Sequence, residues 1–450
     1  MSDTLSAVIA SPRTRREQPA LYVGLNADAP ETPPVRISLT GLDRVEIRRA
    51  DARRITYDRV DDAEVAVVAL ADARLSQGHA RLTCSGTTWT FQDLSSKNGS
   101  WSSGRRIKTQ ELDDGDVIIV GHTALVYRAT GGEAPNVTTP PAATLPGLQT
   151  ISPTLAASFA DLSIAAKTGV AIEVTGETGT GKELIARSVH ALSERPGAFV
   201  AVNCGGIPST LLEAELFGHR KVAFTGATED RPGLVRSADR GTLFLDEIAE
   251  LPPVSQAALL RVLQEGEVTP VGGDRPIRVD LRVVTATHQD LDAAVAAGRF
   301  RADVRARLLG FQFKMPPLRD RREDLSLVVA ALLGRVQRSR RVAFSIDAIA
   351  ALYAYEWPLN IRELERALGS STALPRERIE LADLPAAMHS VFAAEQVVDE
   401  AALTPADRAL RDQLAASIER HGGNLATVAR ELGKDRTQIR RWMKRLGLRR

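Results

Sequence analysis

A glycine-rich loop constrains this chain more than any other feature. Gly176-Glu177-Thr178-Gly179-Thr180-Gly181-Lys182 follows the apolar run Val170–Thr175 and precedes the helical run Leu184–His190. Strand, loop and helix in this order are the context that a Walker A phosphate-binding loop requires. The glycines let backbone N–H groups point at phosphate oxygens, the helix N-terminus adds its positive dipole end, and Lys182 supplies a full charge. The loop therefore predicts an α/β domain that binds a nucleoside triphosphate.

A second strand ends in the two carboxylates that such a site needs. The apolar run Thr242–Leu245 leads directly into Asp246 and Glu247. In a Walker B site the first carboxylate handles Mg²⁺ and the second polarises the attacking water. Glu183 replaces the usual Ser or Thr, so the metal must be coordinated differently. We predict an ATPase that uses ATP and Mg²⁺, with an ATP site over residues 176–183, catalytic Glu247 and Asp246, and Asp246 as the metal ligand.

Length and composition predict several folded domains. The chain has 450 residues, of which 44% are apolar and 25% charged, which is enough for about three domains. Residues 129–148 hold four prolines, three glycines and one charge, a composition that favours an extended linker. Residues 88–93 and 117–127 precede it as β-rich runs, and the pattern from 324 to about 388 is fully helical. We expect an antiparallel all-β sandwich over 21–130, a linker over 131–150, an α/β P-loop core over 151–323, its helical lid over 324–390 and an all-α unit over 405–450.

Cysteine usage favours a reducing compartment, and the hydropathy pattern disfavours a membrane span. Cys84 and Cys204 are far apart and have no Cys or His at metal-ligand spacing, which argues against a zinc site or a disulfide framework. No apolar run reaches the ~18 residues that span a bilayer, and Leu5–Ala10 lacks the basic segment of a signal peptide. We expect a cytoplasmic protein with no membrane partner.

Two further signatures lie between the Walker motifs. They are Glu215-Leu216-Phe217-Gly218-His219 and Val222-Ala223-Phe224-Thr225-Gly226-Ala227. At this point the sequence resembles, from about Ile151 to Met388, the AAA+ domain of bacterial enhancer-binding proteins, the sigma-54 activators. In that family the hexapeptide reads Gly-Ala-Phe-Thr-Gly-Ala and contacts sigma-54, which implies contacts by Phe224, Thr225 and Gly226. Val222 replaces the first glycine, and a β-branched residue disfavours the positive φ that glycine allows.

The same resemblance implies roles for residues around the nucleotide. Asn203 would hold the Walker B glutamate until the γ-phosphate is sensed, and Arg362 would contact the nucleotide, although Leu359 replaces a usual glycine nearby. Arg301 and Arg307 resemble arginine fingers, whose charge stabilises the transferring phosphoryl group in a neighbouring subunit's site. A homo-oligomer, from a dimer to a hexamer ring, is therefore expected.

Two more stretches have counterparts in that family. Thr287-His288 occupies the sensor I position, where His288 could hydrogen-bond toward phosphate in a suitable tautomer. Val271-Gly272-Gly273 resembles the second loop, which supports the sigma-contacting one.

The last 45 residues predict a helix-turn-helix. Residues 424–432 and 435–446 have apolar side chains at core-facing helical spacing on either side of Gly433. Nine Lys or Arg fall in the last 22 residues, although the net charge of the chain is only +2. The unit resembles the Fis-type DNA-binding domain of the same activators, which implies double-stranded DNA at an upstream activating site as a partner. The residues expected to contact DNA are Arg436, Thr437, Gln438, Arg440, Arg441 and Lys444.

Four motifs mark the N-terminal domain. Ile47-Arg48-Arg49, Leu75–His79, Asp93–Gly99 and Asp114-Gly115-Asp116 are spaced as in a forkhead-associated (FHA) domain, a family that binds phosphothreonine proteins or peptides. The resemblance implies that Arg49 and Ser76 hold the phosphate and Asn98 the peptide backbone, with Lys97 near the site and His79 supporting the fold. An FHA sandwich without a ligand is the alternative.

Together these features predict a sigma-54-dependent transcription activator. It would bind DNA upstream of the promoter and hydrolyse ATP in a ring to remodel sigma-54 RNA polymerase, under the control of a phosphothreonine-binding FHA domain. One alternative is an AAA+ ATPase that acts on a target other than sigma-54, which Val222 favours. The other is a non-hydrolysing DNA-bound repressor or adaptor, which the intact Lys182, Asp246 and Glu247 disfavour.

Overall fold

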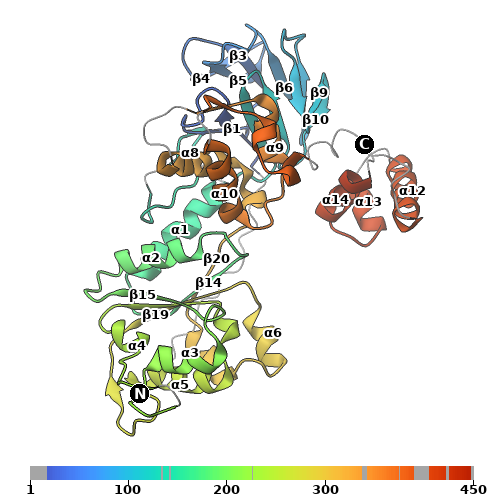
Figure 1. Cartoon of the computed structure of the whole chain (residues 1–450). Coiled ribbons are helices and arrows are strands. Elements are labelled where there is room, and N and C mark those ends of the chain that lie inside the picture. Colours follow the sequence, from blue (N-terminus) through green and yellow to red (C-terminus); the bar gives the residue numbers. More distant parts are fainter. Residues whose placement is uncertain are drawn as a thin grey trace, which may run out of the picture.

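A computed structural model describes residues 18–132, 135–140, 143–224, 227–336, 342–373, 376–389, 405–421 and 425–446. Thr225 and Gly226 lie outside the described residues, as do the side chains of Thr437, Arg440, Arg441 and Lys444. Figure 1 shows an N-terminal β-sandwich next to a helical lid, an α/β domain on the other side of that lid, and a three-helix unit to one side.

The N-terminal unit is a sandwich of two sheets, as predicted. One sheet has the order β13-β2-β1-β12-β11-β8-β9 and the other β10-β7-β6-β3-β5-β4. The strands are β1 (Ala20–Asn26), β2 (Val35–Ser38), β3 (Arg44–Arg49), β4 (Arg54–Val60), β5 (Ala63–Leu70), β6 (Ala80–Ser85), β7 (Thr88–Asp93), β8 (Ser100–Ser102), β9 (Arg105–Ile107), β10 (Thr109–Glu111), β11 (Val117–Val120), β12 (Thr123–Arg128) and β13 (Val137–Thr138).

Two details of the sandwich differ from the prediction. The sandwich is not purely antiparallel, because β4 and β5 form a hairpin that returns β5 alongside β3 in the parallel direction. The expected run 117–127 is two strands, because Gly121 turns the chain at a φ of 58°. Such a φ is readily available only to glycine, so the glycine sets the turn.

The expected linker is attached at both of its ends. β13 pairs with β2, and the buried Arg36 donates hydrogen bonds to the carbonyls of Gly132 and Pro135. Leu145 and Leu148 pack into the core of the α/β domain. The buried Leu145 and Leu148 and the strand pairing of β13 therefore hold the described parts of this segment against the neighbouring domains.

The central unit has a five-stranded sheet of order β15-β16-β19-β14-β20, in which all neighbours are parallel. Helices α1 and α2 cover one face, and α3 and α5 to α7 cover the other. Carboxyl ends of parallel strands share one edge, where ligands of such sheets bind. The elements are α1 (Pro153–Ala166), β14 (Ile172–Thr175), α2 (Lys182–Leu192), β15 (Phe199–Asn203), α3 (Ser209–Phe217), α4 (Leu234–Ser237), β16 (Thr242–Asp246), η1 (Ile248–Glu250), α5 (Pro253–Glu265), β17 (Glu267–Val268), β18 (Ile277–Arg278), β19 (Arg282–Thr287), α6 (Leu291–Ala296), α7 (Ala302–Leu308) and β20 (Phe311–Lys314).

The lid is mainly helical. It contains η2 (Leu318–Asp324), α8 (Leu325–Val336), β21 (Ala343–Phe344), α9 (Ile346–Ala354), α10 (Asn360–Thr372), β22 (Arg378–Ile379) and η3 (Leu381–Asp383). The expectation of a fully helical lid is wrong in one respect, because β21 and β22 pair in parallel. Two-residue strands that are distant in sequence leave no periodic pattern to detect.

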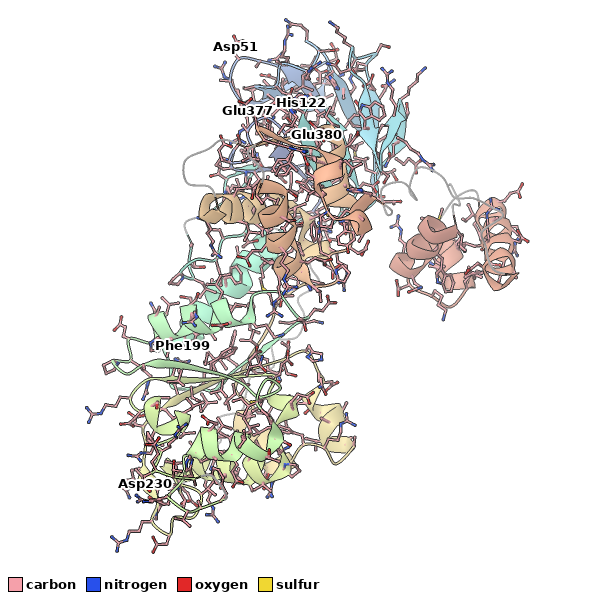
Figure 2. All side chains as sticks on the ribbon, viewed as in Figure 1. Asp51, His122, Phe199, Asp230, Glu377 and Glu380 are labelled. Atoms are coloured by element: carbon pink, nitrogen blue, oxygen red, sulfur yellow. The ribbon has the colours of Figure 1, made fainter. Side chains whose placement is uncertain are left out.

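The sandwich and the lid share one hydrophobic core. Side chains of β1, β11 and β12 pack against α8, α9 and α10 in a single buried cluster. Tyr353 on α9 accepts a hydrogen bond from the Leu25 N–H at 3.2 Å. Asp28 joins His122 to Arg378, at 2.5 and 3.0 Å, and Figure 2 places His122 beside the lid segment that carries Glu377 and Glu380. The sandwich is therefore attached to the lid over a continuous apolar surface.

The C-terminal unit packs three helices, α12 (Pro405–Arg420), α13 (Leu425–Glu431) and α14 (Arg436–Leu446). Gly433 has a φ of 62° between α13 and α14, and the Asp435 carboxylate caps α14 by accepting from the Gln438 N–H at 2.7 Å. The predicted core residues Leu425, Val428, Ala429, Ile439 and Leu446 are buried, and α12 adds Leu414 and Ile418. None of the helices in the described part of the chain is long and apolar enough to cross a membrane.

Candidate nucleotide site and its accessory surfaces

The glycine-rich loop lies directly against the first turn of α10. Gly179 has a φ of 79°, and a Cβ atom there would lie 2.1 Å from the Leu359 carbonyl oxygen. Its own carbonyl accepts a hydrogen bond from the Ile361 N–H at 3.0 Å. Any side chain at Gly179 would push the lid away, so glycine is needed for packing as well as for phosphate approach.

The predicted Walker residues converge at the carboxyl edge of the sheet. Lys182 begins α2, and its Nζ donates to the Gly176 carbonyl at 3.0 Å and lies 3.6 Å from Glu247 Oε1. Asp246 ends β16, where burial, and then the charge of Glu247, raise the pKa of its carboxyl. A cation beside Asp246 would offset both effects, because it favours the ionised form.

Glu247 is held by a histidine. His288 Nδ1 lies 2.6 Å from Glu247 Oε2, and since a carboxylate can only accept, this contact requires the Nδ1–H form of the ring. Asn203 ends β15 next to Asp246, but its Oδ1 accepts from the Gly205 N–H at 3.0 Å. In this structure Glu247 is therefore held by His288 and lies near Lys182, whereas the Asn203 side chain binds the Gly205 N–H instead.

The lid contributes residues that the sequence reasoning missed. Asn360, which is fully buried, donates to Glu177 Oε2 at 3.2 Å and to the Thr178 carbonyl at 3.0 Å. Arg319 in η2 also binds Glu177, and this hydrogen bond lowers the pKa of the Glu177 carboxyl. The sequence shows Arg319 only as one of three arginines between Leu318 and Glu323 and gives no sign of its partner.

Arg362 and Leu359 occupy their predicted neighbourhood. Arg362 is exposed on α10, and its Cβ would lie 3.1 Å from a Cβ at Gly179. Leu359 has a φ of −106°, which any residue adopts. The missing glycine at position 359 therefore costs nothing here.

The side chains of Arg301, Arg307 and Glu183 are exposed and make only local contacts among the described residues. Arg301 is the N-cap residue of α7 and binds Asp303 at 2.7 Å. Arg307 lies on the same helix, and both arginines are exposed. Glu183 is also exposed and binds Arg187 one turn along α2.

The predicted sigma-contacting loop is exposed and closed at its base. Arg220 binds Asp230 at 2.6 Å across the base, and Figure 2 shows Asp230 at the end of the molecule opposite the sandwich. Val222 is 80% exposed and has a φ of 69°. Phe224 packs edge-on against His219 with ring centroids 5.0 Å apart.

The second loop lies against this first one. The Val271 carbonyl accepts from the Arg220 N–H at 2.9 Å. A Cβ at Gly272 would lie 2.8 Å from the Ala223 Cβ. The two loops are therefore mutually supported.

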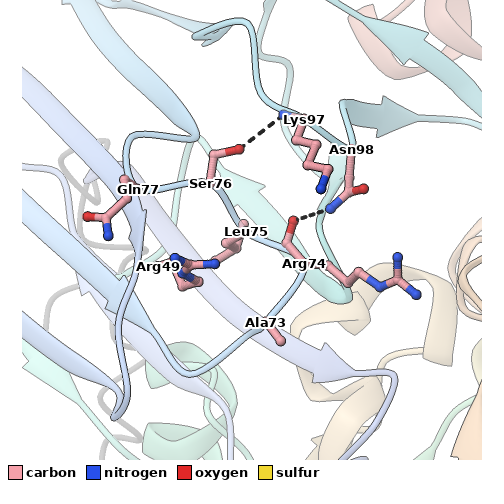
Figure 3. Close-up of a pocket in the computed structure, with 8 residues that line it drawn as sticks. All are labelled: Arg49, Ala73, Arg74, Leu75, Ser76, Gln77, Lys97 and Asn98. Atoms are coloured by element: carbon pink, nitrogen blue, oxygen red, sulfur yellow. Dashed lines mark hydrogen bonds between the residues drawn. The ribbon is translucent and has the colours of Figure 1, made fainter.

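The FHA-like residues line one hollow of about 450 Å³ (Figure 3). Arg49 and Ser76 are joined through their backbones at 3.0 Å. Ser76 Oγ accepts from the Lys97 N–H at 3.0 Å, and Asn98 Nδ2 donates to the Arg74 carbonyl at 2.6 Å. Arg74 also lines the hollow and was not predicted.

His79 holds the backbone of Ser76, one of the residues that line this hollow. It is fully buried, and its Nδ1 accepts from the Ser76 N–H at 3.1 Å. Burial lowers the pKa of the His79 imidazole, so the neutral ring that this bond requires is favoured.

The arrangement fits a nucleotide with Mg²⁺. The Gly176–Gly181 backbone and Lys182 form a cradle for phosphate oxygens at the start of α2. Within the described residues, no group of three or more His, Cys, Asp or Glu side chains could hold a metal ion. Asp246 together with phosphate oxygens suits Mg²⁺, which is usually bound by one or two carboxylates plus substrate phosphates.

Comparisons with known proteins agree with this geometry. Residues 148–314 match the model of the sigma-54 interaction domain, 319–401 that of the AAA+ ATPase lid domain and 59–121 that of the FHA domain. The transcriptional regulatory protein ZraR of Salmonella typhimurium is 40% identical over 317 residues, which cover 69% of this chain and 70% of ZraR.

Two further relatives extend the comparison. The hydrogenase transcriptional regulatory protein HoxA of Cupriavidus necator is 43% identical over 62% of this chain, and the match spans only 60% of HoxA. The crystal structure of NtrX from Brucella abortus in complex with ADP has a TM-score of 0.52 and 31% identity, and the match covers 67% of this chain and 70% of NtrX. The chain therefore belongs to the family of transcriptional regulators built on a sigma-54 interaction domain and an AAA+ lid, with an FHA domain preceding them.

Proposed function

We propose that this protein is a sigma-54-dependent transcription activator that hydrolyses ATP in a ring. One observation carries the proposal most directly. An exposed loop containing Val222 and Phe224 projects from the same domain in which Lys182, Asp246 and Glu247 converge. An output loop and a hydrolysis site in one domain can be coupled when the loop has a different arrangement in each nucleotide state.

The chemistry follows from the positions of the side chains. Bound ATP with Mg²⁺ supplies the transferable phosphoryl group and its charge neutralisation. Lys182 and the loop N–H groups would orient the phosphates, and Asp246 would hold the metal ion. Glu247 orients the attacking water, and release from His288 would free its carboxylate for that role. Arg301 and Arg307 would stabilise the transferring charge in the neighbouring subunit.

Both alternatives are disfavoured by specific residues. A non-hydrolysing adaptor does not require Lys182 and Glu247 to lie 3.6 Å apart with a half-buried Asp246 beside them. The other alternative, an AAA+ ATPase that acts on a target other than sigma-54 (the altered-target ATPase), was favoured only by the replacement of a glycine with Val222. Val222 adopts a left-handed φ, which a glycine at this position would adopt without strain, so the substitution does not argue against the sigma-54 contact.

Open-complex formation tests the proposal. Purified protein with ATP should convert sigma-54 RNA polymerase at a promoter with its upstream site into a heparin-resistant complex. Hydrolysis should rise more than linearly with protein concentration, because a neighbour completes each site. Polymerase containing a different sigma factor is the control. ATP hydrolysis and DNA binding without open complexes would favour the altered-target ATPase.

We further propose that the three-helix unit binds double-stranded DNA. Gln438 and Arg436 lie in the first turn of α14, the part of a recognition helix that enters the major groove. Thr437, Arg440 and Arg441 would contact bases or nearby phosphates, and Lys444 a phosphate, by sequence position. A dimer would place two such helices on two half-sites.

The FHA domain is proposed to report phosphothreonine to the ATPase. Arg128 on β12 donates to Glu323 of η2 at 2.6 Å, and Arg319 of the same segment binds the P-loop residue Glu177 at 2.8 Å. A phosphopeptide that shifts the sandwich would therefore move a segment in contact with the P-loop. This coupling needs two arrangements of η2.

A phosphothreonine peptide should bind the full chain, and an unphosphorylated copy should not. Arg49→Ala and Ser76→Ala are each expected to weaken binding by about 10- to 100-fold, because hydrogen bonds to a charged group contribute about 1.5–3 kcal/mol. Fluorescence anisotropy with a labelled peptide library measures this change. Arg59→Ala, an exposed arginine of β4, is the matched control. Equal affinity for both peptides would favour an FHA domain without a phosphothreonine ligand.

A further inference from the structure

A buried guanidinium joins α7 to the strand that leads into the P-loop. Arg305 lies on α7 with 8% of its side chain exposed. Its Nη1 donates to Glu173 Oε2 at 2.7 Å. Its Nε and Nη2 donate to the two carboxylate oxygens of Asp292 on α6, at 2.8 and 3.1 Å. One side chain thus connects α7, α6 and β14.

Glu173 is an unusual residue for its place in the sheet. It is 2% exposed, and its neighbours across the sheet on the same face are Thr285 and then Leu245, which belongs to the apolar core beneath α5 to α7. A buried carboxylate is costly unless it is paired and hydrogen-bonded. Arg305 pairs with it, and Gln312 on β20 donates a second hydrogen bond at 2.9 Å.

α7 depends on such contacts for its orientation. It has only seven residues, and an isolated helix of this length is marginal in water. The Arg301 N–H at its start donates to Oε1 of the buried Gln256 at 2.8 Å. Val304 and Leu308 add apolar contacts, which are not directional. The planar guanidinium of Arg305 binds Asp292 through one edge and Glu173 through another. We infer that these directional contacts fix the rotation of α7 about its axis.

We propose that Arg305 is a positioning residue that sets the orientation of Arg301 and Arg307 relative to the P-loop strand of their own subunit. The proposal rests on the proposed function, in which these two arginines act on the neighbouring subunit's nucleotide. Glu173 lies three residues before Gly176, the first glycine of the loop. The Arg305–Glu173 pair therefore links the site that holds one nucleotide to the arginines that act on the next.

The test is complementation between two defective full-length variants. Arg305→Gln should keep ATP affinity near wild type, because it leaves Lys182 and Glu247 in place. Its kcat should fall about 10- to 100-fold, since small misplacements of a reacting group cost this much. The Lys182→Ala variant binds ATP poorly, but its Arg301 and Arg307 can still act on the nucleotide of a neighbouring subunit. Mixed rings should hydrolyse ATP faster than the mean of the two separate proteins, because Lys182→Ala subunits complete the sites of Arg305→Gln subunits.

Two controls separate positioning from folding and from the ring itself. Arg301→Ala mixed with Lys182→Ala tests whether arginines act in trans at all. The double variant Glu173→Gln/Arg305→Gln removes the unpaired buried charge. It should regain the melting temperature lost in Arg305→Gln, yet keep the low kcat and the rescue by Lys182→Ala. Arg305→Lys should recover part of kcat, because it restores a charge without the fork.

Each outcome decides between the hypotheses. Failure of the Arg301→Ala mixture to recover activity would reject the ring model and, with it, the proposed function. Recovery in the Arg301→Ala mixture without recovery for Arg305→Gln or the double variant would overturn the positioning role of Arg305 alone. Wild-type kcat in Arg305→Gln would also overturn it.

Discussion

Replacing Glu247 with glutamine is expected to lower kcat for ATP hydrolysis by about 10²- to 10⁴-fold, the range that a positioned general base contributes. ATP affinity should stay near wild type, because Glu247 lies beside Lys182 without belonging to the phosphate cradle. Glutamine fills the same volume and can still contact His288, but it cannot accept a proton from water. Steady-state hydrolysis together with equilibrium binding of a fluorescent ATP analogue separates the two effects.

Two comparison variants sharpen this test. Lys182→Ala should weaken ATP binding itself by about 10- to 100-fold, because charge-assisted hydrogen bonds to phosphate are lost. Glu250→Gln is the matched control, since Glu250 lies three residues from Glu247 and binds Gln289 at 2.6 Å instead. An unchanged kcat in Glu247→Gln would show that Glu247 does not act on the attacking water.

Replacing Phe224 with alanine is expected to reduce open-complex formation about 30-fold or more while ATP hydrolysis stays nearly intact. Truncating an aromatic anchor at the centre of an interface costs about 2 kcal/mol or more. Phe224 is 38% exposed and packs on His219, whereas the contacts of Lys182 and Glu247 are with Gly176, Glu177, His288 and each other. Thr225→Ala is expected to act in the same direction. Both activities are measured on one preparation, by phosphate release and by heparin-resistant complexes.

Controls for this uncoupling come from the same domain. Ile164→Ala removes an apolar side chain that is 69% exposed on α1 and should change neither activity. Val222→Gly should preserve or raise activation, because a β-branched residue with a φ of 69° is strained by about 1–2 kcal/mol. If Phe224→Ala lowers hydrolysis and activation equally, the loop belongs to the ATPase site and does not carry the output.

Local motifs predicted the nucleotide site because their residues are consecutive in the sequence. The glycines of 176–181, the lysine after them and the carboxylates after β16 lie in the expected strand-loop-helix context. Helix and strand periodicities likewise predicted the sandwich, the parallel sheet and the two helices of the C-terminal helix-turn-helix, which are α13 and α14. Their boundaries moved by one or two residues, since helix and strand ends depend on capping contacts.

Other features depend on residues that are distant in sequence, and periodicity carries no information about their contacts. Asn360 lies 182 residues from the Thr178 carbonyl that it binds, and the Glu247–His288 contact joins residues 41 apart. The shared core of sandwich and lid is of the same kind, because the apolar faces of β1 and α9 each read as ordinary core faces of separate domains.

The sequence by itself thus determined the domain types and the chemical groups available for ATP hydrolysis, because a phosphate loop and its carboxylates require fixed residues at short spacing. Only the tertiary structure decided which side chain holds Glu247, how the sandwich is attached to the lid and that Arg305 binds the buried Glu173. These are choices among many compatible partners. Packing and the pairing of buried polar groups settle such choices as the chain folds.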